Sequence, residues 1–221
     1  MSTLTIFIYK GSNKNLYHHQ IGFIAWRCLP TSDGKYTVEA VWELVDKNPT
    51  DVSTSIITWC KEIPTKVLGF VWRAAQGKIS SAKALCKRGV PVPSIACGIC
   101  GETEDADHIL TSCPFAVKLR SWISTWTGVV LPTITTMKGL LNFVDHWDRC
   151  PKKRLILKMI IYRLFCSLWK ARNNRVFNKC LVSAFGVFED TFSLVFFWLI
   201  HRGNFGRGNW STWRIPPFEG L

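Results

Sequence analysis

The chain has 221 residues, and 48% of them are apolar. A chain of this size and composition can bury one good core or two small ones, which excludes disorder throughout. Lys and Arg number 28 against 15 Asp and Glu, so the formal net charge is +13 at pH 7. This charge favours a phosphate-rich partner or an anionic surface, and a basic protein without such a partner is the alternative.

Cysteine usage and the apolar runs indicate the compartment. The nine cysteines are scattered apart from one cluster, which suits a reducing compartment better than a disulfide framework. The apolar run Leu4–Tyr9 is too short for a secretory signal, and the uncharged run Thr191–Ile200 is about half of a bilayer span. We therefore expect a nuclear or cytoplasmic protein that is not secreted and has no membrane partner. The other six cysteines are interpreted as small hydrophobic residues: Cys28, Cys60, Cys86, Cys150, Cys166 and Cys180.

The N-terminal part of the chain predicts a short pair of strands. Residues 1–21 are weakly patterned and stay unassigned. Short β-branched and aromatic runs at Ile21–Ala25 and Tyr36–Val38 flank the turn signal Thr31–Gly34, which is typical of paired strands. Glu39–Lys47 then continues as a predicted helix with one apolar face.

The remainder of the chain predicts helices. Pro64 suits the first position of a helix because it lacks an N–H, and apolar residues then recur at helical spacing until Gly77. Ser80 or Ser81 is suited to cap the next helix. Four further helices are expected, with the bounds Pro114–Trp126, Met137–Trp147, Lys152–Asn173 and Val187–Ile200. The segment His201–Asn209 is rich in Gly, Asn and Arg, and we expect it to be a mobile tail.

A metal-binding pattern lies in the middle of the chain. Cys97, Cys100, His108 and Cys113 follow the spacing C-x2-C-x7-H-x4-C. Three thiolates and one imidazole are the donor set of a closed tetrahedral zinc site, which leaves no position for water or substrate. Gly98 is expected to relieve crowding in the first turn, and the second pair is expected on a short helix or turn. We predict structural zinc, whose chelation melts the surrounding region.

The loop between the two halves of this pattern is acidic. Carboxylates are hard oxygen donors and a poor match beside three thiolates, so we interpret the loop as a solvated turn. Its acidic residues are Glu102, Glu104, Asp105 and Asp107.

A series of short motifs follows in order: Trp26, Asp33–Val38, Trp59, Ile63–Val67, Phe70–Arg73, Arg88–Val90, the four metal-binding candidates and Cys113–Phe115. Together they resemble the reverse-transcriptase zinc-binding domain of plant non-LTR (LINE-type) retrotransposon proteins, over roughly Gly22 to Trp126. Trp169–Phe177 is similar to a segment that commonly follows this domain. The resemblance implies the three cysteines and the histidine as zinc ligands, and a position downstream of a polymerase.

Catalytic patterns do not accompany the zinc motif in the sequence. A polymerase of this type needs an aspartate pair that holds two magnesium ions, and no Asp-Asp pair occurs. The acidic residues are clustered rather than spread as a ribonuclease H site requires. We therefore expect no enzymatic activity and no catalytic residues.

Basic side chains predict a nucleic-acid surface. The basic residues between Lys61 and Arg88 are expected to face only Glu62 as a counter-charge. The candidate nucleic-acid contacts are Lys66, Arg73, Lys78, Lys83, Lys87 and Arg88. A second basic cluster is Lys152, Lys153 and Arg154, followed by Lys170, Arg172 and Arg175, and ordinary solubility is the alternative for both clusters. Trp72 and Trp169 are interpreted as core anchors rather than base-stacking platforms.

Three hypotheses for the whole chain stay open. The first is a zinc-stabilised module of a retrotransposon reverse transcriptase that contacts RNA or DNA. The second is a protein-interaction scaffold, in which the aromatic helices Leu155–Trp169 and Phe188–Trp198 dock onto a partner such as the polymerase domain. The third is a retroelement relic that folds without a function.

The predicted fold is mainly α with a short N-terminal β pair, and it combines a small helical domain centred on a zinc knuckle with C-terminal helices. The expected organisation is an N-terminal segment at 1–21, the zinc-binding domain at 22–126, a helical region at 127–200 and a Gly/Arg-rich tail at 201–221.

Overall fold

The computed structural model describes residues 57–203, 210–213 and 218. The predicted strand pair, the helix Glu39–Lys47 and the first 21 residues lie outside this range, as does most of the predicted tail. The described elements are α2 (Thr65–Ala75), α3 (Ala82–Lys87), η1 (His108–Ser112), α4 (Pro114–Thr127), α5 (Met137–His146), α6 (Pro151–Asn178), α7 (Ala184–Arg202) and α8 (Trp210–Trp213). An isolated antiparallel bridge joins Ala96 and Thr103. The prediction of a mainly helical fold is therefore confirmed for the described residues.

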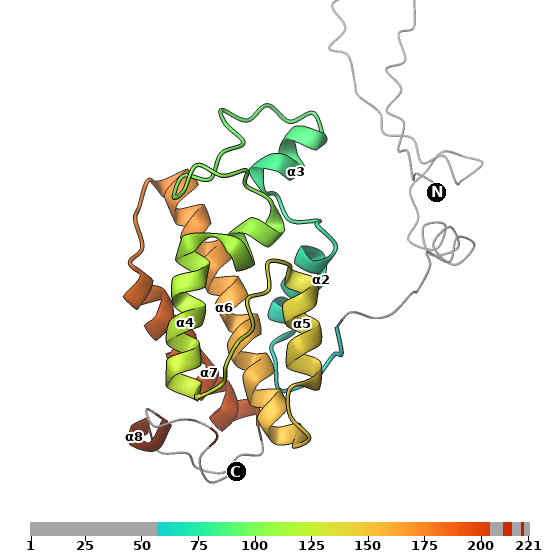
Figure 1. Ribbon diagram of the computed structural model, residues 1–221, viewed down its shortest axis with the longest axis vertical. Coiled ribbons are helices and arrows are strands. Elements are labelled where there is room, and N and C mark those ends of the chain that lie inside the picture. Colours follow the sequence, from blue (N-terminus) through green and yellow to red (C-terminus); the bar gives the residue numbers. More distant parts are fainter. Residues whose placement is uncertain (1–56, 204–209, 214–217, 219–221) are drawn as a thin grey trace, which may run out of the picture. The chain divides into compact units, whose positions relative to one another are not determined.

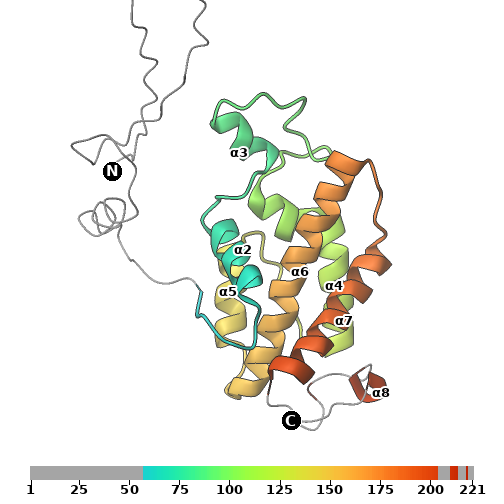
Figure 2. The same cartoon turned by 180° about the vertical axis from the view of Figure 1, so that it is seen from behind.

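Helix α6 forms the centre of the bundle. It contacts α2, α5, α7 and η1, while α4 lies against α7 and η1. Figures 1 and 2 show α6 between α2 and α5 on one side and α4 and α7 on the other. Nearly every position from Ile156 to Leu168 is buried, including Tyr162 and Phe165. A helix that is apolar around its whole circumference is buried on all sides, which explains why α6 has no exposed face in this stretch.

Local signals fix several helix ends. The Ser81 hydroxyl accepts a hydrogen bond from the Ala84 N–H, so Ser81 rather than Ser80 caps α3. Pro64 lies one position before the first residue of α2, with an extended ψ of 135°. Helix α6 continues to Asn178, five residues beyond the predicted end at Asn173, and stops where Lys179 adopts a left-handed φ of 54°.

Helix α7 is long and apolar enough to cross a membrane by length and composition alone. In the bundle it lies along α6 and α4, and its inward face is buried, including Phe192, Val195 and Trp198. Its Asp190 forms an ion pair with Arg163 of α6. The inward face of α7 is thus part of the bundle core.

Candidate metal centre

The first half of the metal centre is a tight turn between Cys97 and Cys100. The Gly101 N–H donates to the Cys97 carbonyl at 2.9 Å, and the Cys97 N–H donates to the Glu102 carbonyl at 2.7 Å. Gly101 has a φ of +82°, which L side chains rarely adopt. The backbone conformation of this turn therefore requires a glycine at position 101 and not at position 98.

The second half is one turn of π-helix. Cys113 donates its N–H to the carbonyl of His108 at 2.8 Å, five residues back along the chain. This wider turn brings the two ligands to the same side, and such single π turns are frequent at functional sites. Pro114 then begins α4. The expected short helix or turn is confirmed, and the π geometry is the feature that the sequence did not indicate.

The four ligand atoms converge. They all lie within 4.8 Å of one another, with the Cys100 Sγ and His108 Nε2 atoms 3.2 Å apart and the Cys97 and Cys113 sulfurs 4.0 Å apart. Two thiolates bound tetrahedrally to one zinc at about 2.3 Å would have sulfurs roughly 3.8 Å apart. Apart from Cys100, which is partly exposed, the ligands are buried. The residues therefore fit a tetrahedral zinc ion in size and donor chemistry, and they form the zinc-binding group.

Because their sulfurs lie close together, the two buried thiols, Cys97 and Cys113, have different pKa values. A hydrogen bond from the Cys113 thiol lowers the pKa of Cys97 to about 4, whereas the same contact and burial raise the pKa of Cys113. One thiolate is thus stabilised at the expense of the other as long as the cluster has no cation. A zinc ion supplies the positive charge that lets all three cysteines bind as thiolates.

Glu104 lines the same small cavity as the ligands Cys97 and Cys113, and it is 4% exposed. Its carboxylate accepts hydrogen bonds from the Ala82 N–H at 3.0 Å and from the Arg172 Nε at 3.1 and 3.2 Å. Its backbone is paired with Ile95 and with Lys83. One residue thus joins the knuckle to the start of α3 and to the C-terminal part of α6. The interpretation of this loop as a solvated turn is wrong for Glu104.

Two aspartates of the same loop are also structural. Asp105 accepts from the His108 N–H at 2.9 Å and pairs with Lys83 at 2.9 Å, which orients the turn carrying the histidine ligand. Partial burial opposes this charge, but the two contacts hold the pKa of Asp105 below its usual value. Asp107 accepts from the Met137 N–H at 2.7 Å and so fixes the start of α5.

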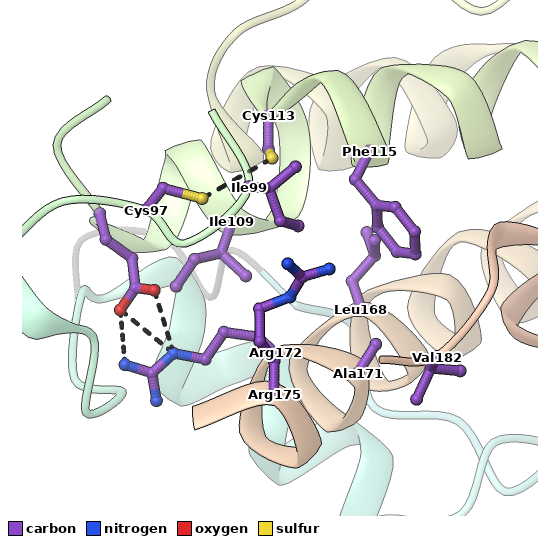
Figure 3. A pocket seen from close by; sticks show the side chains of 11 residues that line it. Cys97, Ile99, Ile109, Cys113, Phe115, Leu168, Ala171, Arg172, Arg175 and Val182 are labelled. Atoms are coloured by element: carbon purple, nitrogen blue, oxygen red, sulfur yellow. Dashed lines mark hydrogen bonds and ion pairs between the residues drawn. The ribbon is translucent and has the colours of Figure 1, made fainter. Parts of the chain in front are cut away.

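Helix α6 supports the knuckle from the other side, as Figure 3 shows around a small cavity of about 30 Å³. Arg175 donates to the Gly98 carbonyl at 3.1 Å, and the Arg172 guanidinium lies 5.1 Å from the Trp169 ring centroid. These two arginines of the second predicted basic cluster therefore bind the knuckle. Sequence reasoning missed this role because the contacts span 68 and 77 residues of chain.

The six candidate nucleic-acid contacts lie on and around α2 and α3. Lys83 is engaged with Asp105, so the expectation that Glu62 alone faces these cations is wrong for that residue. The other five are exposed, and none of them belongs to an ion pair in the described part of the chain: Lys66, Arg73, Lys78, Lys87 and Arg88.

The solvent exposure of three side chains contradicts their predicted positions in the core. Trp72 is 40% exposed and is not a core anchor, whereas Trp169 is partly buried and packs against Phe70. Cys86 and Cys180 are exposed rather than small core residues. The position of Trp72 was readable from the sequence, since it falls outside the helical stripe of apolar residues that begins at Val67.

Comparison with known proteins gives one match. Residues 36–122 match the family model described as zinc-binding in reverse transcriptase. No curated protein and no solved structure matches the chain. The matched segment contains all four ligands and the turns that position them, and the geometry of the ligands suits zinc. Residues 36–122 are therefore similar to the zinc-binding domain of reverse transcriptases, and the four ligands within them form a zinc-binding group.

Proposed function

We propose that the chain is a structural zinc module that holds RNA or DNA through phosphate contacts, as part of a retrotransposon reverse transcriptase. The observation that carries this proposal is the set of five exposed basic side chains on and around α2 and α3, none of which is in an ion pair within the described residues. Cations that are held by acidic neighbours have less to gain from phosphate, so unpaired ones favour binding.

The zinc centre supports the proposal by fixing the geometry of this surface. Glu104 accepts from the first N–H of α3, and Asp105 holds Lys83 on the same helix. The loop between the metal ligands thus positions α3, which carries Lys87, with Arg88 directly after it. We infer that loss of zinc loosens the basic surface as well as the knuckle.

Salt dependence tests the proposal. The affinity for a labelled oligonucleotide should fall steeply as salt rises, because each neutralised phosphate releases counterions. Replacement of Lys87 or Arg88 by Gln should weaken binding and reduce the slope of log K against log salt by about one. Lys118→Gln is the matched control, since Lys118 is exposed on α4, which lies across α6 from α2 (Figures 1 and 2), and belongs to neither basic cluster. Absent binding at low salt, or a flat salt response, would contradict the proposal.

A second candidate is a protein-docking role, which one observation favours. Large apolar side chains are exposed where α6 turns into α7: Phe177 at 72%, Leu181 at 71% and Phe185 at 65%. Most of the helix residues first considered for docking, between Leu155 and Trp169, are buried in the bundle. A partner such as a polymerase domain would therefore use the α6–α7 turn. Loss of complex formation by Phe177→Ser, with binding to nucleic acid retained, is the expected result.

A further inference from the structure

A shallow groove lies along the exposed side of α2. It is lined by Trp59, Lys66, Gly69, Trp72 and Arg73 and has a volume of about 560 Å³. Positions 66, 69, 72 and 73 are three and four residues apart, so they share one side of the helix. The opposite side of α2 is buried against α6 and α5. The groove therefore lies on the exposed side of α2, and the packing of the other side against α6 and α5 holds the helix in place.

Gly69 forms part of the groove and has no structural explanation. It lies inside α2, where glycine destabilises a helix relative to alanine. A Cβ atom placed on Gly69 would meet no atom within 4 Å, and its φ is not positive. Neither internal packing nor backbone conformation thus requires glycine here. A residue without a side chain at this position keeps the groove open and lets a flat group approach the backbone of the helix.

Two aromatic rings and several cations border the same groove. Trp59 is 54% exposed and Trp72 is 40% exposed, which is unusual for so large an apolar side chain. Lys66 and Arg73 line the groove, and the Lys78 ammonium lies 5.5 Å from the Trp72 ring centroid. No carboxylate lines it. A ligand that complements this surface carries flat apolar faces together with regularly spaced negative charge.

We propose that this groove binds a single-stranded stretch of nucleic acid, with bases stacking on Trp59 and Trp72 and phosphates contacting Lys66, Arg73 and Lys78. This inference rests on the proposed function and adds to it a site and a strand preference. Aromatic rings combined with a basic groove are the usual means of holding single strands without sequence preference. In a duplex the faces of the bases are covered by their neighbours, so the rings have nothing to stack on.

The experiment compares binding of an unstructured oligouridine and of an RNA duplex by the full-length zinc-loaded chain. Trp72→Ala should weaken single-strand binding about 5-fold to 140-fold, the range that stacking on one base supplies. Trp72→Phe should restore much of the affinity. Gly69→Leu, which fills the groove without changing charge, should weaken single-strand binding while leaving the melting temperature unchanged or higher. Duplex binding should change little in all three variants.

Phe185→Ala is the matched control, because Phe185 is an exposed aromatic residue at the start of α7, beyond α6 from α2 (Figures 1 and 2). Unchanged single-strand affinity in Trp72→Ala and Gly69→Leu, with steep salt dependence retained, would overturn this inference but would leave the proposed function intact. Equal losses for single strand and duplex would also overturn it. A large fall in melting temperature of Trp72→Ala would show that the ring is covered by protein. Absence of any binding at low salt would remove the proposed function itself.

Discussion

Glu104 offers a direct test of how the zinc knuckle is attached to the helices. Its side chain is 5% exposed and that of Arg172, its ion-pair partner, is 11% exposed. Glu104→Ala removes the carboxylate and leaves a buried guanidinium and the Ala82 N–H without their acceptor. Breaking a buried pair from one side costs about 3–5 kcal/mol in the free energy of unfolding. Glu104→Gln keeps one oxygen acceptor, so its loss should be smaller, about 1.5–3 kcal/mol.

Urea unfolding followed by circular dichroism, in buffer with saturating zinc, measures these changes. Glu102→Ala is the control, since Glu102 is exposed in the same loop and should change stability by less than about 0.5 kcal/mol. A double-mutant cycle with Arg172→Met separates the pair from its surroundings, and a coupling of about 2 kcal/mol or more is expected. A loss of less than about 1 kcal/mol in the free energy of unfolding of Glu104→Ala would refute the reasoning, because a buried charge without a partner should destabilise the fold by more than that.

Two further predictions concern the bundle. Asp107→Ala should lower the free energy of unfolding by about 1 kcal/mol, because the Met137 N–H at the start of α5 loses its acceptor. This is the usual effect of removing a helix-capping acceptor. Unchanged urea unfolding would contradict the prediction. Burial raises the pKa of Cys166 to about 12, so its thiol stays protonated near neutral pH and should react with iodoacetamide far more slowly than exposed Cys86 and Cys180. Mass spectrometry of the alkylated peptides measures this order, and equal labelling would count against it.

The metal ligands and the helices could be predicted because their signals are local. The spacing of the four ligands lies within seventeen positions of chain, and a knuckle turn and a single helical turn can form there without help from distant residues. The capping hydroxyl of Ser81 and the proline that begins α4 are equally local. The π-helical turn escaped prediction because it depends on one hydrogen bond, from Cys113 to His108, rather than on composition.

The role of the acidic loop could not be predicted from composition. Glu104 is buried because Arg172 arrives from α6, and nothing in the loop itself indicates that partner. Asp105 is different, since an aspartate three residues before His108 has the spacing of a capping residue, and that signal was available. The exposure of Trp72 was also available from the apolar stripe of α2, but the size of the ring favoured the core interpretation.

The central claim is that three sulfurs and one imidazole bind a zinc ion that stabilises this part of the chain. Metal analysis of the purified protein, alongside Cys100→Ser and His108→Ala, tests it, with Cys86→Ser as a control outside the cluster. We expect about one zinc per chain in the wild type and the control, a clear loss in both ligand variants, and a lower melting temperature after chelation. Equal zinc content in all four proteins, or a melting temperature that chelation leaves unchanged, would contradict the account.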